Sequence, residues 1–141
     1  MNVIGLGNEW RSDDGAGPEL ARRVGGRVLT GEAVGLIEAF DGLDDVVLVD
    51  AVFSGAPPGT VHVFDASFEP LPSTLFGASS THALGLAEAV ELARSLGRLP
   101  ARVLVYGIEG AGFAFGKGLS PEVEAAVAHV AEEVSACTRS T

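Results

Sequence analysis

Residues 3–17 read VIGLGNEWRSDDGAG, and this stretch decides how the rest of the chain is organised. It begins as a short apolar strand and turns at Gly5, Gly7 and Asn8, residue types that tolerate the positive φ angles of a tight turn. It then presents two adjacent carboxylates, Asp13 and Asp14, and continues as a helix. A strand, a glycine turn and a helix predict an α/β fold whose turn lies at the carboxyl edge of the sheet, where such folds bind ligands.

The hydrophobic pattern predicts the remaining elements of this fold. Apolar runs such as 46–49 fit strands that are buried on both faces. Apolar and polar residues alternate in segment 60–65, as in a strand with one exposed face. The loop between strand 46–49 and this segment is too short for a parallel crossover, so we expect an antiparallel edge strand. The other expected strands are 2–6, 27–30 and 102–107, and the expected helices are 14–24, 32–40, 82–96 and one from 121 onward. This order predicts a three-layer α/β/α sandwich with a mostly parallel five-stranded sheet, in a single domain over residues 1–141.

The composition of the chain excludes several classes of binding partner and of structural site. The 141 residues carry a net charge of −10 and no basic stripe, which argues against nucleic acid. The single cysteine, Cys137, provides neither a disulfide framework nor a cysteine-based zinc site. The amino-terminal residues do not form a signal peptide pattern, and no apolar run approaches the ~20 residues of a membrane span. We therefore expect a monomeric cytoplasmic protein that does not bind membranes.

Three side chains of metal-ligand type are predicted to meet at one edge of the sheet. Asp14 follows the first turn, Asp50 follows the apolar strand 46–49, and His82 falls in the first turn of a predicted helix. The positive end of a helix disfavours a protonated histidine and so favours the neutral form that binds metals. Each residue alone also fits a structural role, either as a helix cap or turn acceptor or as a hydrogen-bonded histidine. Together they predict a three-ligand site with open positions, suited to nickel, zinc, iron or manganese.

Other candidate sites carry weaker patterns. The opening Gly5-x-Gly7 begins like a dinucleotide fingerprint, but Trp10 occupies the place of its third glycine. Ser79 and Ser80 lie near His82, yet the G-x-S-x-G pattern of a nucleophile elbow is missing. Two further histidines, at 62 and 129, are predicted to lie on exposed faces, and nothing in the sequence activates the thiol at position 137.

Four segments in order resemble the hydrogenase maturation endopeptidases, which trim the C-terminal extension from the large subunit of nickel–iron hydrogenases. The segments are GLGN with SDDGAG in 5–17, VLVDA at 47–51 with PGT at 58–60, STHALGL at 80–86, and GIE at 107–109 with GLSPEV at 118–123. The resemblance spans the chain from Val3 to about Val134.

This resemblance implies a function and a site. The metal-contacting residues of the family fall on Asp14, Asp50 and His82, although some members have Glu at the first of these positions. The implied partner is a hydrogenase large-subunit precursor, and the implied metal is nickel carried by that substrate, with no permanently bound cofactor. The peptide bond beside the nickel-binding cysteine motif is cut without a Ser or Cys nucleophile. The metal either polarises the carbonyl or activates a water molecule, and the sequence leaves both routes open.

One segment departs from the family pattern. Residues 29–33 read LTGEA, where members often carry an Asp-Gly-Gly-Thr-like segment that helps to recognise the substrate. The sequence therefore does not identify which hydrogenase is processed. A non-catalytic module of the same fold, which binds the precursor and leaves its mass unchanged, is the alternative function. A nucleotide-binding domain is a third reading and rests only on Gly5-x-Gly7.

Overall fold

The computed structural model describes residues 2–29, 35–76, 85–112, 116 and 118–139, with side chains through Ala136. Its five strands form one sheet in the order β2-β1-β3-β5-β4, in which β4 is antiparallel to β5 and the other pairings are parallel. The strands are β1 (Asn2–Leu6), β2 (Arg27–Leu29), β3 (Asp45–Val52), β4 (Val61–Asp65) and β5 (Arg102–Glu109). The helices are the 3-10 turn η1 (Ser12–Gly15), α1 (Ala16–Val24), α2 (Gly35–Ala39), α3 (Ser73–Phe76), α4 (Leu86–Ser95) and α5 (Pro121–Arg139).

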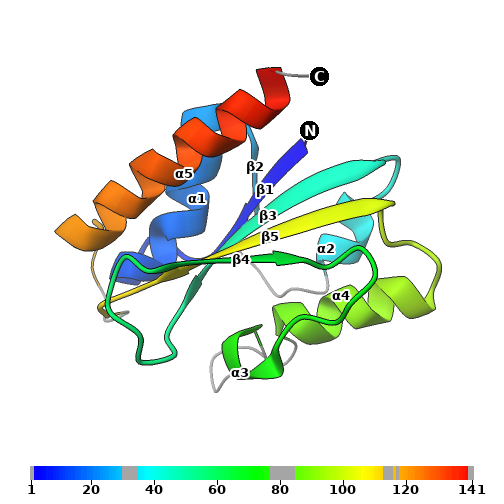
Figure 1. Cartoon of the computed structure of the whole chain (residues 1–141), viewed down its shortest axis with the longest axis horizontal. Helices are drawn as coiled ribbons and strands as arrows, with labels where there is room; N and C mark the ends of the chain where they lie inside the picture. Colours follow the sequence, from blue (N-terminus) through cyan, green and yellow to red (C-terminus); the bar gives the residue numbers. More distant parts are fainter. Residues whose placement is uncertain (1, 30–34, 77–84, 113–115, 117, 140–141) are drawn as a thin grey trace.

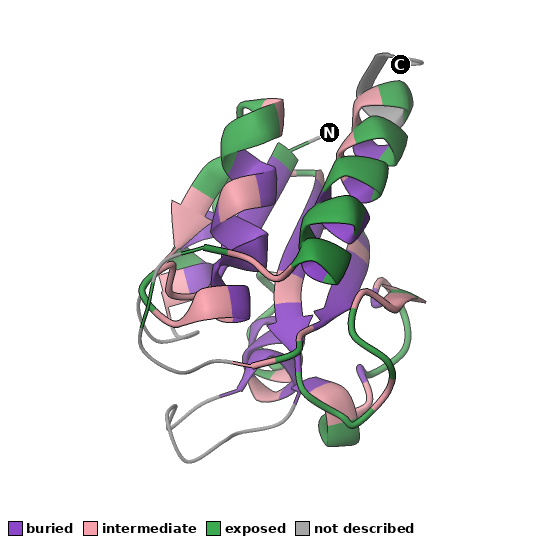
Figure 2. Ribbon diagram, turned by 90° about the vertical axis from the view of Figure 1, so that its left-hand side faces the viewer, coloured by how far each residue is buried: buried purple, intermediate pink, exposed green. Residues whose placement is uncertain are grey.

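Helices cover both faces of the sheet, which gives the molecule three layers (Figure 1). α1 and α5 lie on one face, and their core includes Leu20, Val47 and Val127. α2, α3 and α4 lie on the other face, over a core that includes Leu48 and Val90. The central strands β1, β3 and β5 are mostly buried between the layers, while the outer sides of the helices are exposed (Figure 2). The predicted three-layer sandwich with one antiparallel edge strand is confirmed.

Glycines of the opening stretch let η1 and α1 pack directly on the sheet. A Cβ atom on Gly17 would lie 2.3 Å from the carbonyl oxygen of Leu6 and 2.6 Å from that of Val49, so any side chain there would clash with the backbone. Gly7 has a φ of 140°, in the region that favours glycine. A Cβ on Gly7 would lie 2.0 Å from the carbonyl oxygen of Asp14. The start of the helix therefore lies against the carboxyl ends of β1 and β3.

Several element boundaries differ from the sequence prediction. β3 continues through Asp50 to Val52, because the strand pairs with β5 along its whole length. Gly85, predicted to lie within a helix, has an extended backbone, so α4 begins at Leu86 instead of at residue 82. Leu96, the last residue of the predicted helix 82–96, lies just beyond the end of α4 and is 56% exposed. A short helix, α3, forms in a region where the sequence predicted no helix.

The last helix starts as its sequence predicts. The carbonyl oxygen of Ser120 accepts a hydrogen bond from the backbone N–H of Glu124, and Pro121 occupies the first helical position, where its missing N–H is not needed. Within the described part of the chain, no helix combines the length and the apolar character needed to cross a membrane.

Candidate functional site

Asp14 and Asp50 meet at the point where the direction of strand connection reverses. β1 is followed in sequence by β2 on one side of it, whereas β3 lies on its other side. Open α/β sheets bind ligands at the carboxyl ends of the two strands that flank such a switch point. Asp14 lies in the 3-10 turn that follows β1, and Asp50 lies near the end of β3. Two of the three predicted site residues thus come together at the expected edge.

The strand alternation gives Asp50 a definite face. Leu48 and Val52, two residues before and after it, belong to the core beneath α2 and α4, so the carboxyl group of Asp50 points to that side of the sheet. Its register partner on β5 is Gly107. A Cβ at Gly107 would lie 2.9 Å from Cζ of the Phe76 ring, so that ring packs next to the position of Asp50.

The two carboxylates interact unfavourably with each other. Burial raises the pKa of the Asp50 carboxyl well above its ordinary value, and the nearby negative charge of Asp14 raises it further. A hydrogen bond from the backbone N–H of Ala51 offsets part of this change. Asp14 itself accepts a hydrogen bond of 2.9 Å at Oδ2 from the backbone N–H of Asn8. A pair of carboxylates in this state gains stability when it shares a proton or a cation.

This electrostatic arrangement predicts how stability depends on pH. A carboxyl whose pKa is higher in the folded than in the unfolded state contributes stability below its unfolded pKa, about 3.9, which is lost as pH rises through the folded pKa. We therefore expect the melting temperature of wild-type protein in chelator to fall relative to that of Asp50→Asn as pH rises from about 4 toward neutrality. Thermal melts of both proteins across this range test it. Parallel curves for the two proteins would contradict it.

The third predicted residue, His82, lies outside the described residues, as do Ser79 and Ser80. Among the residues that the structure describes, no three His, Cys, Asp or Glu side chains form a group able to hold a metal ion. The predicted site is therefore represented by its two carboxylates. The segment 29–33, whose sequence departs from the family pattern, also falls outside the described residues, except for Leu29.

Asp13 has a structural role, in contrast to its neighbour Asp14. Its side chain is only 2% exposed. Its carboxylate accepts hydrogen bonds from the backbone N–H groups of Ala111 (2.7 Å), Gly112 (3.4 Å) and Ser120 (2.7 Å), and from the Ser120 hydroxyl (2.9 Å). The sequence showed Asp13 only as one of two adjacent carboxylates, because contacts across about a hundred residues leave no local pattern. This residue joins the segment after β5 to the turn that carries Asp14.

A second buried carboxylate, Glu109, was missed from the sequence. It is 1% exposed and accepts hydrogen bonds from the backbone N–H (3.0 Å) and the hydroxyl of Ser54. Nε2 of His62 lies 3.2 Å from its Oε1. The prediction that His62 lies on an exposed face is wrong. His62 and Phe64 lie on the same face of β4, and Phe64 packs against the core beneath α2, α3 and α4, whereas Val63 on the other face is 50% exposed. His129 does lie on an exposed face, as predicted.

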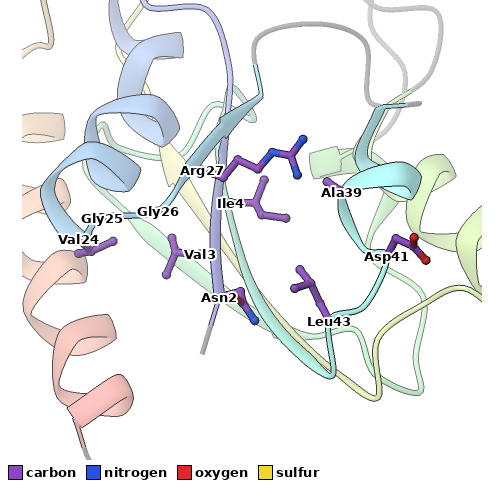
Figure 3. A pocket seen from close by; sticks show the side chains of 10 residues that line it. All are labelled: Asn2, Val3, Ile4, Val24, Gly25, Gly26, Arg27, Ala39, Asp41 and Leu43. Carbon is purple, nitrogen blue, oxygen red and sulfur yellow. The ribbon is translucent and has the colours of Figure 1, made fainter.

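A hollow of about 530 Å³ lies away from these residues. It is lined by residues such as Asn2, Gly25, Arg27 and Leu43 (Figure 3). Asn2 is the first residue of β1, so this hollow is at the amino ends of the parallel strands. The pair of carboxylates lies at the opposite edge, which is where we place the candidate site.

Comparison with known proteins shows a family resemblance along most of the chain. The family model described as hydrogenase maturation protease (HycI) matches residues 30–137. The hydrogenase 2 maturation protease of Escherichia coli (strain K12) is 27% identical in an alignment 148 residues long, which covers 97% of this chain and 89% of the relative.

Solved structures share the fold. The hydrogenase maturating endopeptidase HybD from E. coli superposes with a TM-score of 0.74 at 22% identity, covering 99% of this chain and 93% of that one. The [NiFe] hydrogenase maturation protease HybD from Thermococcus kodakarensis gives a TM-score of 0.69 at 25% identity, with 97% and 99% covered. Because the family model covers well over half of the sequence, this chain belongs to the hydrogenase maturation protease family.

Proposed function

We propose that this protein is an endopeptidase that removes the C-terminal extension from a nickel-loaded hydrogenase large-subunit precursor. In this proposal Asp14 and Asp50 contact the nickel that the substrate carries, and His82, assigned from the sequence alone, is the third contact. The observation that carries the proposal is the pair of mutually repelling carboxylates at the switch point of the sheet. A divalent cation neutralises that repulsion, so the two carboxylates favour binding of a substrate that carries its own metal.

The raised pKa of Asp50 has a consequence for substrate binding. A carboxyl group must be deprotonated to contact a metal, so binding releases any proton that the pair holds. Asp14 is held in place by the N–H of Asn8, and Asp50 by the strand pairing of β3 with β5. Both carboxylates are thus fixed before the substrate arrives. When the nickel is bound, it supplies Lewis-acid chemistry, and hydrolysis adds water across the peptide bond to give a new carboxylate and a free amine.

The proposal predicts that processing depends on nickel in the substrate. We expect the purified protein to cut a nickel-loaded precursor and to leave the nickel-free form intact, with at least about a hundredfold difference in rate because the metal contacts are lost. Mass spectrometry of the large subunit detects the loss of the C-terminal peptide. Equal cutting of both forms would contradict nickel recognition. Binding of the loaded precursor with no change in its mass would instead identify a non-catalytic module.

The monomeric state and the cytoplasmic location expected from the sequence stay predictions within this proposal. Sedimentation of the purified protein and cell fractionation test them.

A further inference from the structure

Two large aromatic side chains, in the segments of the chain that carry Asp14 and Asp50, are exposed and are not used by the proposed metal contacts. Trp10 is 59% exposed and Phe53 is 41% exposed. Trp10 lies between β1 and the turn that carries Asp14, and Phe53 follows Asp50 by three residues. Both aromatic side chains therefore belong to the segments that form the candidate site.

The backbone of Trp10 is fixed by the same turn that holds Asp14. Its N–H donates to Oδ1 of Asn8 at 3.0 Å, and the backbone N–H of Asn8 donates to Asp14. The carbonyl oxygen of Trp10 accepts a hydrogen bond of 2.8 Å from the N–H of Gly116. The indole is thus presented from a backbone that is hydrogen-bonded on both sides.

The ring of Phe53 packs against the segment that follows β5. A Cβ atom on Gly110 would lie 2.5 Å from Cε1 of the Phe53 ring and 3.0 Å from Cβ of Asp13, so the ring lies over this glycine. The loop that begins at Phe53 is anchored at its start by the Glu109 carboxylate, which binds Ser54. The backbone of Glu109 anchors its end through 2.8 Å hydrogen bonds with Gly59 and Thr60. These two segments, 8–12 and 53–54, are called the aromatic rim below.

We propose that the aromatic rim is the surface that docks the precursor polypeptide, with Trp10 and Phe53 packing against apolar side chains that flank the bond to be cut. This inference depends on the proposed function, because it names further contacts for that substrate. A peptide bond presented to Asp14 and Asp50 brings chain on both sides of it, at about 3.3–3.6 Å per residue, so two or three flanking residues extend over the adjoining surface. Trp10 comes four residues before Asp14 and Phe53 comes three residues after Asp50, so a polypeptide bound at the two carboxylates passes the segments that carry both rings.

The properties of the rim suit such a contact. Aromatic residues bury a large area when a partner covers them, and they dominate the energy of many interfaces. Side chains on an anchored backbone lose little conformational freedom on binding, which favours affinity. The carboxylates provide the contact with the metal, and the rim provides the contact with the polypeptide.

The test compares exposed aromatic residues at the two ends of the sheet. Phe53→Ala and Trp10→Ala are each expected to raise the KM for the nickel-loaded precursor about tenfold, with kcat within about twofold of wild type, because the lost contact is made equally before and during the reaction. Phe53→Tyr keeps the ring and is expected to restore the wild-type KM. The matched control is Phe68→Ala. Phe68 is 89% exposed, and Ser67 beside it accepts a hydrogen bond at Oγ from the N–H of Val103 near the start of β5, at the far edge.

The outcomes separate this inference from the proposed function. A KM that rises for both rim variants and stays unchanged for Phe68→Ala supports docking at the rim. If the rim variants have the same KM as Phe68→Ala, or if they lower kcat at constant KM, the docking inference is overturned. The proposed function still stands in that case, provided that the wild-type protein cuts the nickel-loaded precursor. If the wild-type protein cuts no nickel-loaded precursor, the proposed function fails and the docking inference fails with it.

Discussion

Asp50→Asn is expected to abolish precursor processing, by at least about a thousandfold, while leaving the protein folded and no less stable than wild type at neutral pH. The amide is a poor metal ligand compared with a carboxylate, so the contact with the substrate nickel is lost. Stability is kept because the replaced group is one whose charge is disfavoured by burial and by Asp14. Processing is measured by the mass of the large subunit, and stability by thermal melts.

The control for this variant lies on the same strand. Asp45→Asn makes the same chemical change at the first residue of β3, at the opposite edge of the sheet, and should process the precursor at the wild-type rate. Processing by Asp50→Asn within tenfold of wild type would show that this carboxylate is not part of the reaction. A melting temperature well below that of wild type would show that its charge stabilises the fold.

Asp13→Ala is expected to destabilise the fold by about 3–5 kcal/mol, which lowers the melting temperature by about 10 °C or more. The carboxylate is buried and accepts bonds from three backbone N–H groups and one hydroxyl, all in the segment between β5 and α5. Removing the carboxylate leaves those part-buried donors without their acceptor. Urea denaturation followed by circular dichroism gives the free energy of unfolding.

The adjacent residue provides the control for this second prediction. Asp14→Asn removes a carboxylate from the next position in the same turn, yet it should change the free energy of unfolding by less than about 1 kcal/mol while it abolishes processing. It also removes one of the causes that raise the pKa of Asp50. If the Asp13 and Asp14 variants were equally destabilised, the separation of structural and functional roles between the neighbours would be wrong.

The glycine turn and the apolar runs made the fold predictable. The run 46–49 fitted a strand buried on both faces, and the glycines of 3–17 fitted the close approach of a helix to the ends of β1 and β3. Element ends were less predictable, because they depend on pairing. β3 extends to Val52 since β5 offers partners that far, which places Asp50 within the strand. The extended backbone of Gly85 likewise moved the start of α4.

By itself the sequence determined the layer architecture, the edge of the sheet at which we place the candidate site, and the choice of Asp14 and Asp50 as candidate residues, because strand and helix periods and turn residues are local properties of the chain. Only the tertiary structure decided that Asp13 and Glu109 are buried anchors, that His62 contacts Glu109, and that Trp10 and Phe53 are exposed. The physical reason is that these roles depend on contacts between segments about fifty to a hundred residues apart, and such contacts leave no periodic pattern in the sequence.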